Sequence, residues 1–116
     1  MNPNNIPFRV TDWEKIPVTE HKGETGTAYW RTLQFGSLRV RVVEYSADYR
    51  ADHWCEKGHI LYCIEGEMIT ELKGGEEFIL KAGMSYEVSD DFSSHRSRTE
   101  KGAKLFIVDG EFLKLK

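Results

Sequence analysis

Turn-forming residues recur at short intervals along the chain, and this spacing restricts the folds available to it. Between the turns lie runs of a few residues rich in Val, Ile, Tyr, Phe and Thr, which favour strands. Two stretches, Arg39 to Val42 and Ile69 to Leu72, alternate with period two, and neither carries a sustained 3.6-residue hydrophobic pattern. Short β-rich runs with such frequent turns are typical of an all-β sandwich or barrel. The turn signals are Gly23-Glu24-Thr25-Gly26, Gly36-Ser37, Lys57-Gly58, Gly66, Gly74-Gly75, Ala82-Gly83, Asp90-Asp91, Lys101-Gly102 and Asp109-Gly110.

The runs between these turns give the expected strands. Alternation with period two is clearest at Arg39-Val40-Arg41-Val42. Asp12 to Ile16 predicts a short helical turn with Asp12 as its N-cap, ended by Pro17. The closing Phe112 to Leu115 segment predicts an edge strand or a tail packed on the barrel. The predicted strands are Thr27–Phe35, Leu38–Tyr45, His59–Ile64, Met68–Leu72, Glu77–Leu80, Ser85–Val88, His95–Glu100 and Lys104–Val108.

The length of 116 residues corresponds to one domain. We expect a single domain over 1–116, with 1–26 as an N-terminal arm and 38–109 as the barrel core. The apolar runs, such as Leu105 to Val108, are much shorter than the roughly 20 residues of a membrane span. The first residues are polar and do not resemble a secretory signal, so the expected compartment is the cytoplasm.

The net charge restricts the expected binding partners, and the two cysteines raise the question of their chemical state. The formal net charge is −3 and no basic stripe stands out, so no nucleic-acid partner is expected. Arg39 and Arg41 alternate with valines, which is typical of a solvated face; an anion-binding pocket is the alternative. Cys55 and Cys63 are expected to be a ligand or a buried thiol rather than a disulfide in a cytoplasmic protein. Cys63 is expected in the core.

The segment from His59 to Ile64 is apolar on both of its alternating faces. His59, Leu61 and Cys63 share one face, and Ile60, Tyr62 and Ile64 form the other. A strand of this kind is expected to be buried on both sides, under a second sheet or a partner chain. We therefore expect a homodimer.

Four side chains have the spacing of a metal site: His53, Cys55, His59 and His95. In an extended chain, His53 and Cys55 lie on one face, and the Lys57-Gly58 turn can return His59 beside them. His95 opens another predicted strand. Imidazole and thiolate ligands favour a divalent transition metal over Mg²⁺ or Ca²⁺. Zinc is the first choice, with iron, nickel or manganese as alternatives. No separate nucleophile–base pair is visible, and no catalytic residue is assigned.

These residues also carry a family resemblance. The chain resembles the cupins, small β-barrels with two metal-binding motifs. In the first motif, His53 matches the first histidine, Cys55 replaces the second, His59 replaces the glutamate and Gly66 is the closing glycine. In the second, Gly83 opens the motif and His95 matches its histidine with one residue inserted. The run Ala51-Asp52-His53-Trp54-Cys55 is similar to the cupin subfamily named for a DHCW motif.

The resemblance implies a small cupin-type β-barrel, also called a double-stranded β-helix or jelly roll. The usual three-His-one-Glu site would become three-His-one-Cys, with the metal inside the barrel and open to a small-molecule ligand. Cupins include sugar isomerases, dioxygenases and sensors, so the fold does not select a reaction. Metal-dependent chemistry on a small molecule is the leading hypothesis. The alternatives are a non-catalytic module that binds or senses a small ligand or metal, and a structural site that stabilises a dimer.

Overall fold

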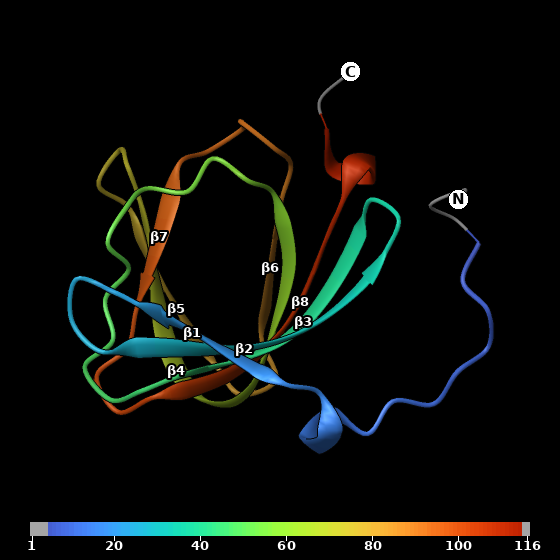
Figure 1. Cartoon of the computed structure of the whole chain (residues 1–116). Coiled ribbons are helices and arrows are strands. Elements are labelled where there is room, and N and C mark those ends of the chain that lie inside the picture. Colours follow the sequence, from blue (N-terminus) through green and yellow to red (C-terminus); the bar gives the residue numbers. More distant parts are fainter. Residues whose placement is uncertain (1–4, 115–116) are drawn as a thin grey trace.

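The protein folds into antiparallel β-strands that wrap around a common interior (Figure 1). The computed structural model describes residues 5–114. The strands are hydrogen-bonded in the order β1-β2-β3-β8-β4-β5, and β6 and β7 also pair with β4. The elements are η1 (Trp13–Lys15), β1 (Val18–Lys22), β2 (Thr27–Phe35), β3 (Leu38–Tyr45), β4 (His59–Leu72), β5 (Glu77–Lys81), β6 (Ser85–Val88), β7 (His95–Arg98), β8 (Ala103–Asp109) and η2 (Glu111–Leu113).

The all-β prediction is confirmed, and the two helical elements are 3-10 turns of three residues each. Within residues 5–114, no helix has the length and apolar character needed to cross a membrane. The helical turn after Asp12 is confirmed, because the Asp12 carboxylate accepts a hydrogen bond from the Glu14 amide at 3.2 Å. β1 was not predicted, although it pairs with β2 along its length, from Val18 with Arg31 to Lys22 with Thr27.

The long strand β4 joins the two halves of the barrel. Its first half pairs with β6 and β8, and its second half pairs with β5 and β7. The sequence predicts two strands here, separated at Gly66; that prediction is wrong. Gly66 has a positive φ of 78°, and the register with β8 shifts between Cys63 and Glu65. The irregularity therefore lies just before the glycine, and β4 continues through it as one strand.

The hydrophobic core lies on the inner faces of the strands. Alternate residues of β8 are buried along its whole length. Leu61 and Cys63 of β4 point inward with 1% and 0% of their surface exposed. The core cluster consists of Ala28, Val43, Leu61, Cys63, Met68, Leu80, Ala103, Leu105 and Ile107. Cys63 is thus a core residue, as expected from the sequence.

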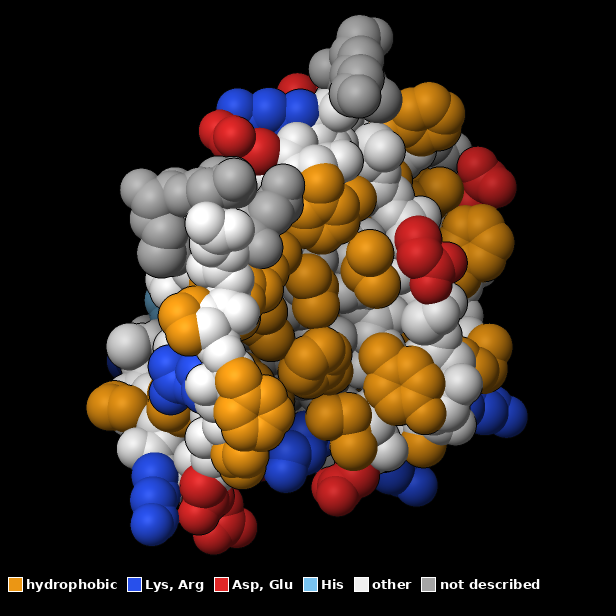
Figure 2. All heavy atoms as spheres, turned by 90° about the vertical axis from the view of Figure 1, so that its right-hand side faces the viewer, with side chains coloured by type: hydrophobic (Ala, Val, Ile, Leu, Met, Phe, Trp, Pro, Cys, Tyr) orange, Lys and Arg blue, Asp and Glu red, His pale blue; other side chains and the backbone are white. Residues whose placement is uncertain are grey.

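The outer face of β4 is exposed in the single chain, so within the described residues no second sheet covers it, and its cover by a partner chain stays a prediction. Ile60, Tyr62 and Ile64 are 40%, 46% and 37% exposed. Figure 2 shows hydrophobic side chains gathered on one face of the molecule, with charged side chains mainly around its edges. The inner face of β4 is covered by the rest of the barrel, whereas this outer face remains accessible in the single chain.

Of the two alternatives predicted for the C-terminal segment, the edge strand is not observed within the described residues. Phe112 and Leu113 belong to the 3-10 turn η2 rather than to an edge strand, and Leu115 lies outside the described residues. The Asp90 amide donates a hydrogen bond to the Leu113 carbonyl at 2.8 Å, so the turn is tied to the loop after β6.

Candidate metal centre

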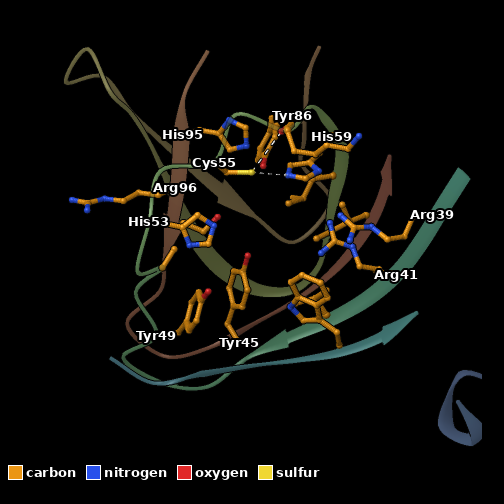
Figure 3. A pocket seen from close by; sticks show the side chains of 17 residues that line it. Arg39, Arg41, Tyr45, Tyr49, His53, Cys55, His59, Tyr86, His95 and Arg96 are labelled. Carbon is orange, nitrogen blue, oxygen red and sulfur yellow. Dashed lines mark hydrogen bonds between the residues drawn. The ribbon is translucent and has the colours of Figure 1, made fainter. Parts of the chain in front are cut away.

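Three side chains that the sequence predicts as ligands converge inside the barrel. One ligand atom from each of Cys55, His59 and His95 lies within 4.8 Å of the other two. The Cys55 Sγ is 3.7 Å from the His59 Nε2 (Figure 3). The two imidazole rings meet edge to face, with their centroids 5.4 Å apart. Two nitrogens and one sulfur are therefore gathered closely enough to surround one ion.

Backbone pairing places two of these residues opposite each other. Cys55 and His95 form an isolated antiparallel bridge, in which the Cys55 amide donates to the His95 carbonyl at 2.7 Å and the His95 amide donates back at 3.1 Å. His59 is the first residue of β4 and His95 the first residue of β7. Because each side chain stands at a hydrogen-bonded strand end or bridge, the cluster is fixed by backbone rather than by a free loop.

His95 presents an unpartnered nitrogen to the cluster. Its Nδ1 lies 2.8 Å from the Ser93 carbonyl oxygen, a contact in which the imidazole must donate. The neutral ring then carries a lone pair on Nε2. That Nε2 is buried without a hydrogen-bond partner among residues 5–114, and only 3% of the residue is exposed. A buried nitrogen without a partner is costly, and a metal ion bound by Cys55 and His59 would satisfy it.

His59 is oriented by a carboxylate behind it. Its Nδ1 is 3.0 Å from Asp109 Oδ2, so a neutral ring directs its Nε2 lone pair toward Cys55. Asp109 is 2% exposed and also accepts hydrogen bonds from Arg39 and Arg41. A carboxylate that receives the second nitrogen of a ligating imidazole is a common feature of protein metal sites.

The surroundings of Cys55 lower the pKa of its thiol. Burial raises its pKa, whereas the hydrogen bond from His59 and the positive charge that this ring carries when it is protonated lower it. A backbone hydrogen bond at Lys57 and the charge of Arg41 also act to lower it. The resulting pKa lies below the ordinary value for a cysteine. Since the thiolate is the form that binds metal, a lowered pKa favours coordination near neutral pH.

His53 lies outside this close group. Its side chain is 75% exposed and its Nδ1 is 2.6 Å from the Asp52 carboxylate. His53 does line the same cavity as the other three residues, below Cys55 in Figure 3. The structure thus brings together three of the four predicted ligands. The donor set suits a transition metal, whereas the three-His-one-Cys arrangement remains a prediction.

The cluster opens into a cavity of about 270 Å³ that other side chains complete. Sequence reasoning did not single out Asp109, and it favoured a solvated position for Arg39 and Arg41. The structure corrects the expectation for Arg41, which is 4% exposed and lines the cavity. Further lining residues include Trp30, Tyr45, Tyr49, Tyr86 and Arg96. Burial raises the pKa values of the Tyr45 and Tyr86 hydroxyls, so both remain neutral donors.

Solved structures of similar fold include one that is described as a cupin-like protein. A cupin-like protein from Thermotoga maritima matches with a TM-score of 0.69 and 18% identity, over 80% of this chain and 77% of that chain. Ectoine synthase from P. lautus matches with a TM-score of 0.68 and 23% identity, over 94% of this chain and 80% of that chain. Fe(II) HppE in complex with substrate matches with a TM-score of 0.71 and 20% identity, over 88% of this chain and 60% of that chain.

No family model and no curated protein sequence matches the chain. The narrower resemblance to the DHCW subfamily therefore remains a prediction from the Ala51–Cys55 run. At identities of 18–23%, the structural matches concern the fold, and they agree with its antiparallel strand order. The chain therefore has a cupin-like fold.

Proposed function

We propose that the protein binds one divalent transition metal through Cys55, His59 and His95, and that this metal acts on a small molecule in the adjoining cavity. The observation that carries the proposal is the buried Nε2 of His95, which lacks a hydrogen-bond partner beside a sulfur and a second imidazole nitrogen. Hydrogen bonds to Asp109 and Ser93 orient the two imidazole rings, and one metal ion could be bound by both nitrogens and the sulfur.

The donor set favours zinc. One thiolate and two neutral imidazoles are borderline-soft ligands, and a Cys–His₂ set leaves one position of a tetrahedral zinc site for water or substrate. Iron is the main alternative, because HppE of similar fold is described as an Fe(II) form with substrate. A bound ion of either kind would polarise a substrate oxygen or lower the pKa of bound water.

The protein's own residues would position the ion and the substrate. Asp109 holds the His59 ring in orientation, and the Ser93 carbonyl does the same for His95. Tyr45 and Tyr86 line the cavity as neutral hydroxyls that can hydrogen-bond a substrate. The apolar side chains of Leu61 and Ile107 line the same cavity and limit access of water.

His53 distinguishes this proposal from its alternative. With three ligands the site keeps an open position, which favours catalysis. If the His53 ring leaves Asp52 and joins the metal, four protein ligands would fill a tetrahedral site. A filled site would instead favour a metal-binding or sensing module. The 75% exposure of the His53 side chain supports the three-ligand form.

Metal analysis of the purified protein tests the proposal. Wild type prepared without chelators is expected to hold about one transition-metal ion per chain. Cys55→Ser and His95→Ala are each expected to lose most of it, while the exposed His21→Ala serves as the matched control and retains it. Circular dichroism verifies that each variant is folded. Wild type that stays metal-free after dialysis against zinc would overturn the proposal.

We also propose that a second copy of the chain covers the outer face of β4. Ile60, Tyr62 and Ile64 alternate along this face with more than a third of each side chain exposed. The face shown in Figure 2 is apolar and poor in charge at its centre. It is therefore complementary to an identical surface, which a two-fold axis would place opposite it.

A further inference from the structure

Arg41 is a buried cation with a hydrogen-bonding group left unused. It lies in the middle of β3 with 4% of its surface exposed. Its Nε is buried and has no hydrogen-bond partner in the part of the chain that the structure describes. Because the guanidinium stays charged and its donors are costly to bury unpaired, this geometry points to an acceptor supplied from outside the chain.

The only carboxylate that contacts Arg41 in the described chain also contacts two other side chains. Asp109 accepts one hydrogen bond from Arg41 at 2.9 Å and two from Arg39, each at 3.0 Å. It also contacts His59 at 3.0 Å. One negative charge therefore faces two guanidinium groups, and the cluster keeps an excess positive charge beside the cavity.

The other cavity cations have partners of their own. The Nε of Arg96 donates to Glu71 at 2.7 Å, and its guanidinium lies over the Trp54 ring at 4.4 Å. Lys57 is 3.6 Å from the Asp90 carboxylate. Among the described residues that line the cavity, Arg41 is thus the cation with a buried donor free for a ligand.

Arg41 is also close to the candidate metal ligands. Arg41 and His59 both contact Oδ2 of Asp109, so the guanidinium and the imidazole are neighbours around a single oxygen atom. Both residues line the cavity together with Cys55 and His95 (Figure 3). The Trp30 ring lies under the Arg41 guanidinium, 4.3 Å from its central carbon, and fixes the plane of this group.

We propose that the cavity binds small carboxylic acids, with the substrate carboxylate accepting a hydrogen bond from the Nε–H of Arg41. The remainder of the molecule would then face Cys55, His59 and His95, an orientation that rests on the proposed metal function. The planar guanidinium suits a carboxylate because its donors are arranged to meet two oxygens. The excess positive charge is neutralised when the anion binds.

Nuclear magnetic resonance of the chelator-treated protein tests the anion site without relying on the metal. The arginine Nε–Hε signals are observed in ¹⁵N-labelled protein, and the Arg41 signal is the one missing from Arg41→Lys. Lactate is the probe, and its neutral amide, lactamide, is the control. We expect lactate to shift the Arg41 Hε signal downfield as it gains an acceptor, and lactamide to leave it in place.

The variants give a second measurement. Arg41→Lys keeps the charge but removes Nε–H, and it is expected to weaken lactate binding by about tenfold or more. Arg31→Lys is the matched control: Arg31, on β2, does not line this cavity, and the variant is expected to bind normally. An Arg41 Hε signal that is unmoved at saturating lactate, or equal binding of lactamide, would overturn the proposal.

Two further results separate this proposal from the metal function. If sulfate shifts the Arg41 signal at the same ionic strength and lactate does not, the carboxylate assignment is wrong. If lactate binds as expected but the protein takes up no metal, the anion site stands and the metal proposal fails. If the protein takes up metal but the Arg41 signal does not respond to lactate, the metal proposal stands and the anion site fails.

Discussion

His59 and Asp109 are joined by a 3.0 Å contact between Nδ1 and Oδ2, which links the first residue of β4 to the last residue of β8. Strand pairing brings these ends together, because β4 and β8 are antiparallel neighbours. The contact fixes which nitrogen of His59 faces Cys55. The cluster of Cys55, His59 and His95 is therefore supported by a carboxylate that is distant from His59 in sequence and is not one of the proposed ligands.

Asp109→Asn is expected to weaken metal binding by 10- to 100-fold, which is the usual effect of removing such a supporting carboxylate. The asparagine keeps the size of the side chain but removes the charge that orients His59. Competition with a chromophoric zinc chelator measures the affinity. Asp12→Asn, at the cap of η1, is the control and should bind zinc as wild type does. Equal affinities in Asp109→Asn and wild type would show that the contact does not support the site.

Asp109 also predicts a pH dependence of folding stability. Burial raises the pKa of its carboxyl, but the hydrogen bonds from His59 and Arg39 and the charge of Arg41 lower it well below the ordinary value. The folded pKa lies below the unfolded one. The stabilisation is therefore complete above the unfolded pKa of about 4 and is lost as the pH falls below it.

Urea denaturation of the metal-free protein measures this effect. Near pH 7, Asp109→Asn is expected to be less stable than wild type by about 3 kcal/mol, because two arginines lose their buried partner. The difference should shrink between pH 4 and pH 2.5. A difference that stays constant over this acid range would mean that Asp109 does not titrate with a lowered pKa in the folded protein.

The two cysteines provide an internal comparison for metal binding. Cys55 is partly exposed to the cavity and has a lowered pKa, so iodoacetamide should alkylate it in the metal-free protein at pH 7. Saturating zinc is expected to slow this reaction by at least about tenfold, since the metal occupies the thiolate. Cys63 is fully buried and should remain unmodified under both conditions. Peptide mass spectrometry distinguishes the sites. Equal rates for Cys55 with and without zinc would argue against coordination by its sulfur.

Sedimentation velocity tests the proposed dimer. Wild type is expected to sediment as a dimer, and Tyr62→Glu should dissociate it by placing charges in the apolar contact. Phe78→Glu, an equally exposed aromatic position on β5, is the matched control and should remain dimeric. A monomeric wild type at micromolar concentrations would contradict the proposal.

Local sequence patterns predicted much of the fold. Thr27–Phe35, Leu38–Tyr45 and Ser85–Val88 were predicted with the bounds that the structure has, because clear turns enclose their β-rich residues. β1 was missed because all five of its residues are exposed and carry no apolar pattern. Its pairing with β2 is a long-range interaction that a local pattern does not contain.

The site was predicted in part for similar reasons. Cys55, His59 and His95 were found by their residue types and spacing. The expectation that His53 shares their site assumed an extended chain from His53 to Cys55. The backbone bends at 52–53 instead, so alternation does not apply there. Arg41 and Asp109 could not be connected to His59 from sequence, because their contacts depend on the register of β3 with β8.

X-ray absorption spectroscopy of the zinc-loaded protein tests the central claim most directly. We expect one sulfur at about 2.3 Å and two imidazole nitrogens at about 2.0–2.1 Å, with a further light atom in the open position. Cys55→Ser should remove the sulfur from this shell. A zinc shell without sulfur in wild type, or a shell that is unchanged in Cys55→Ser, would contradict the assignment of Cys55, His59 and His95 as the metal centre.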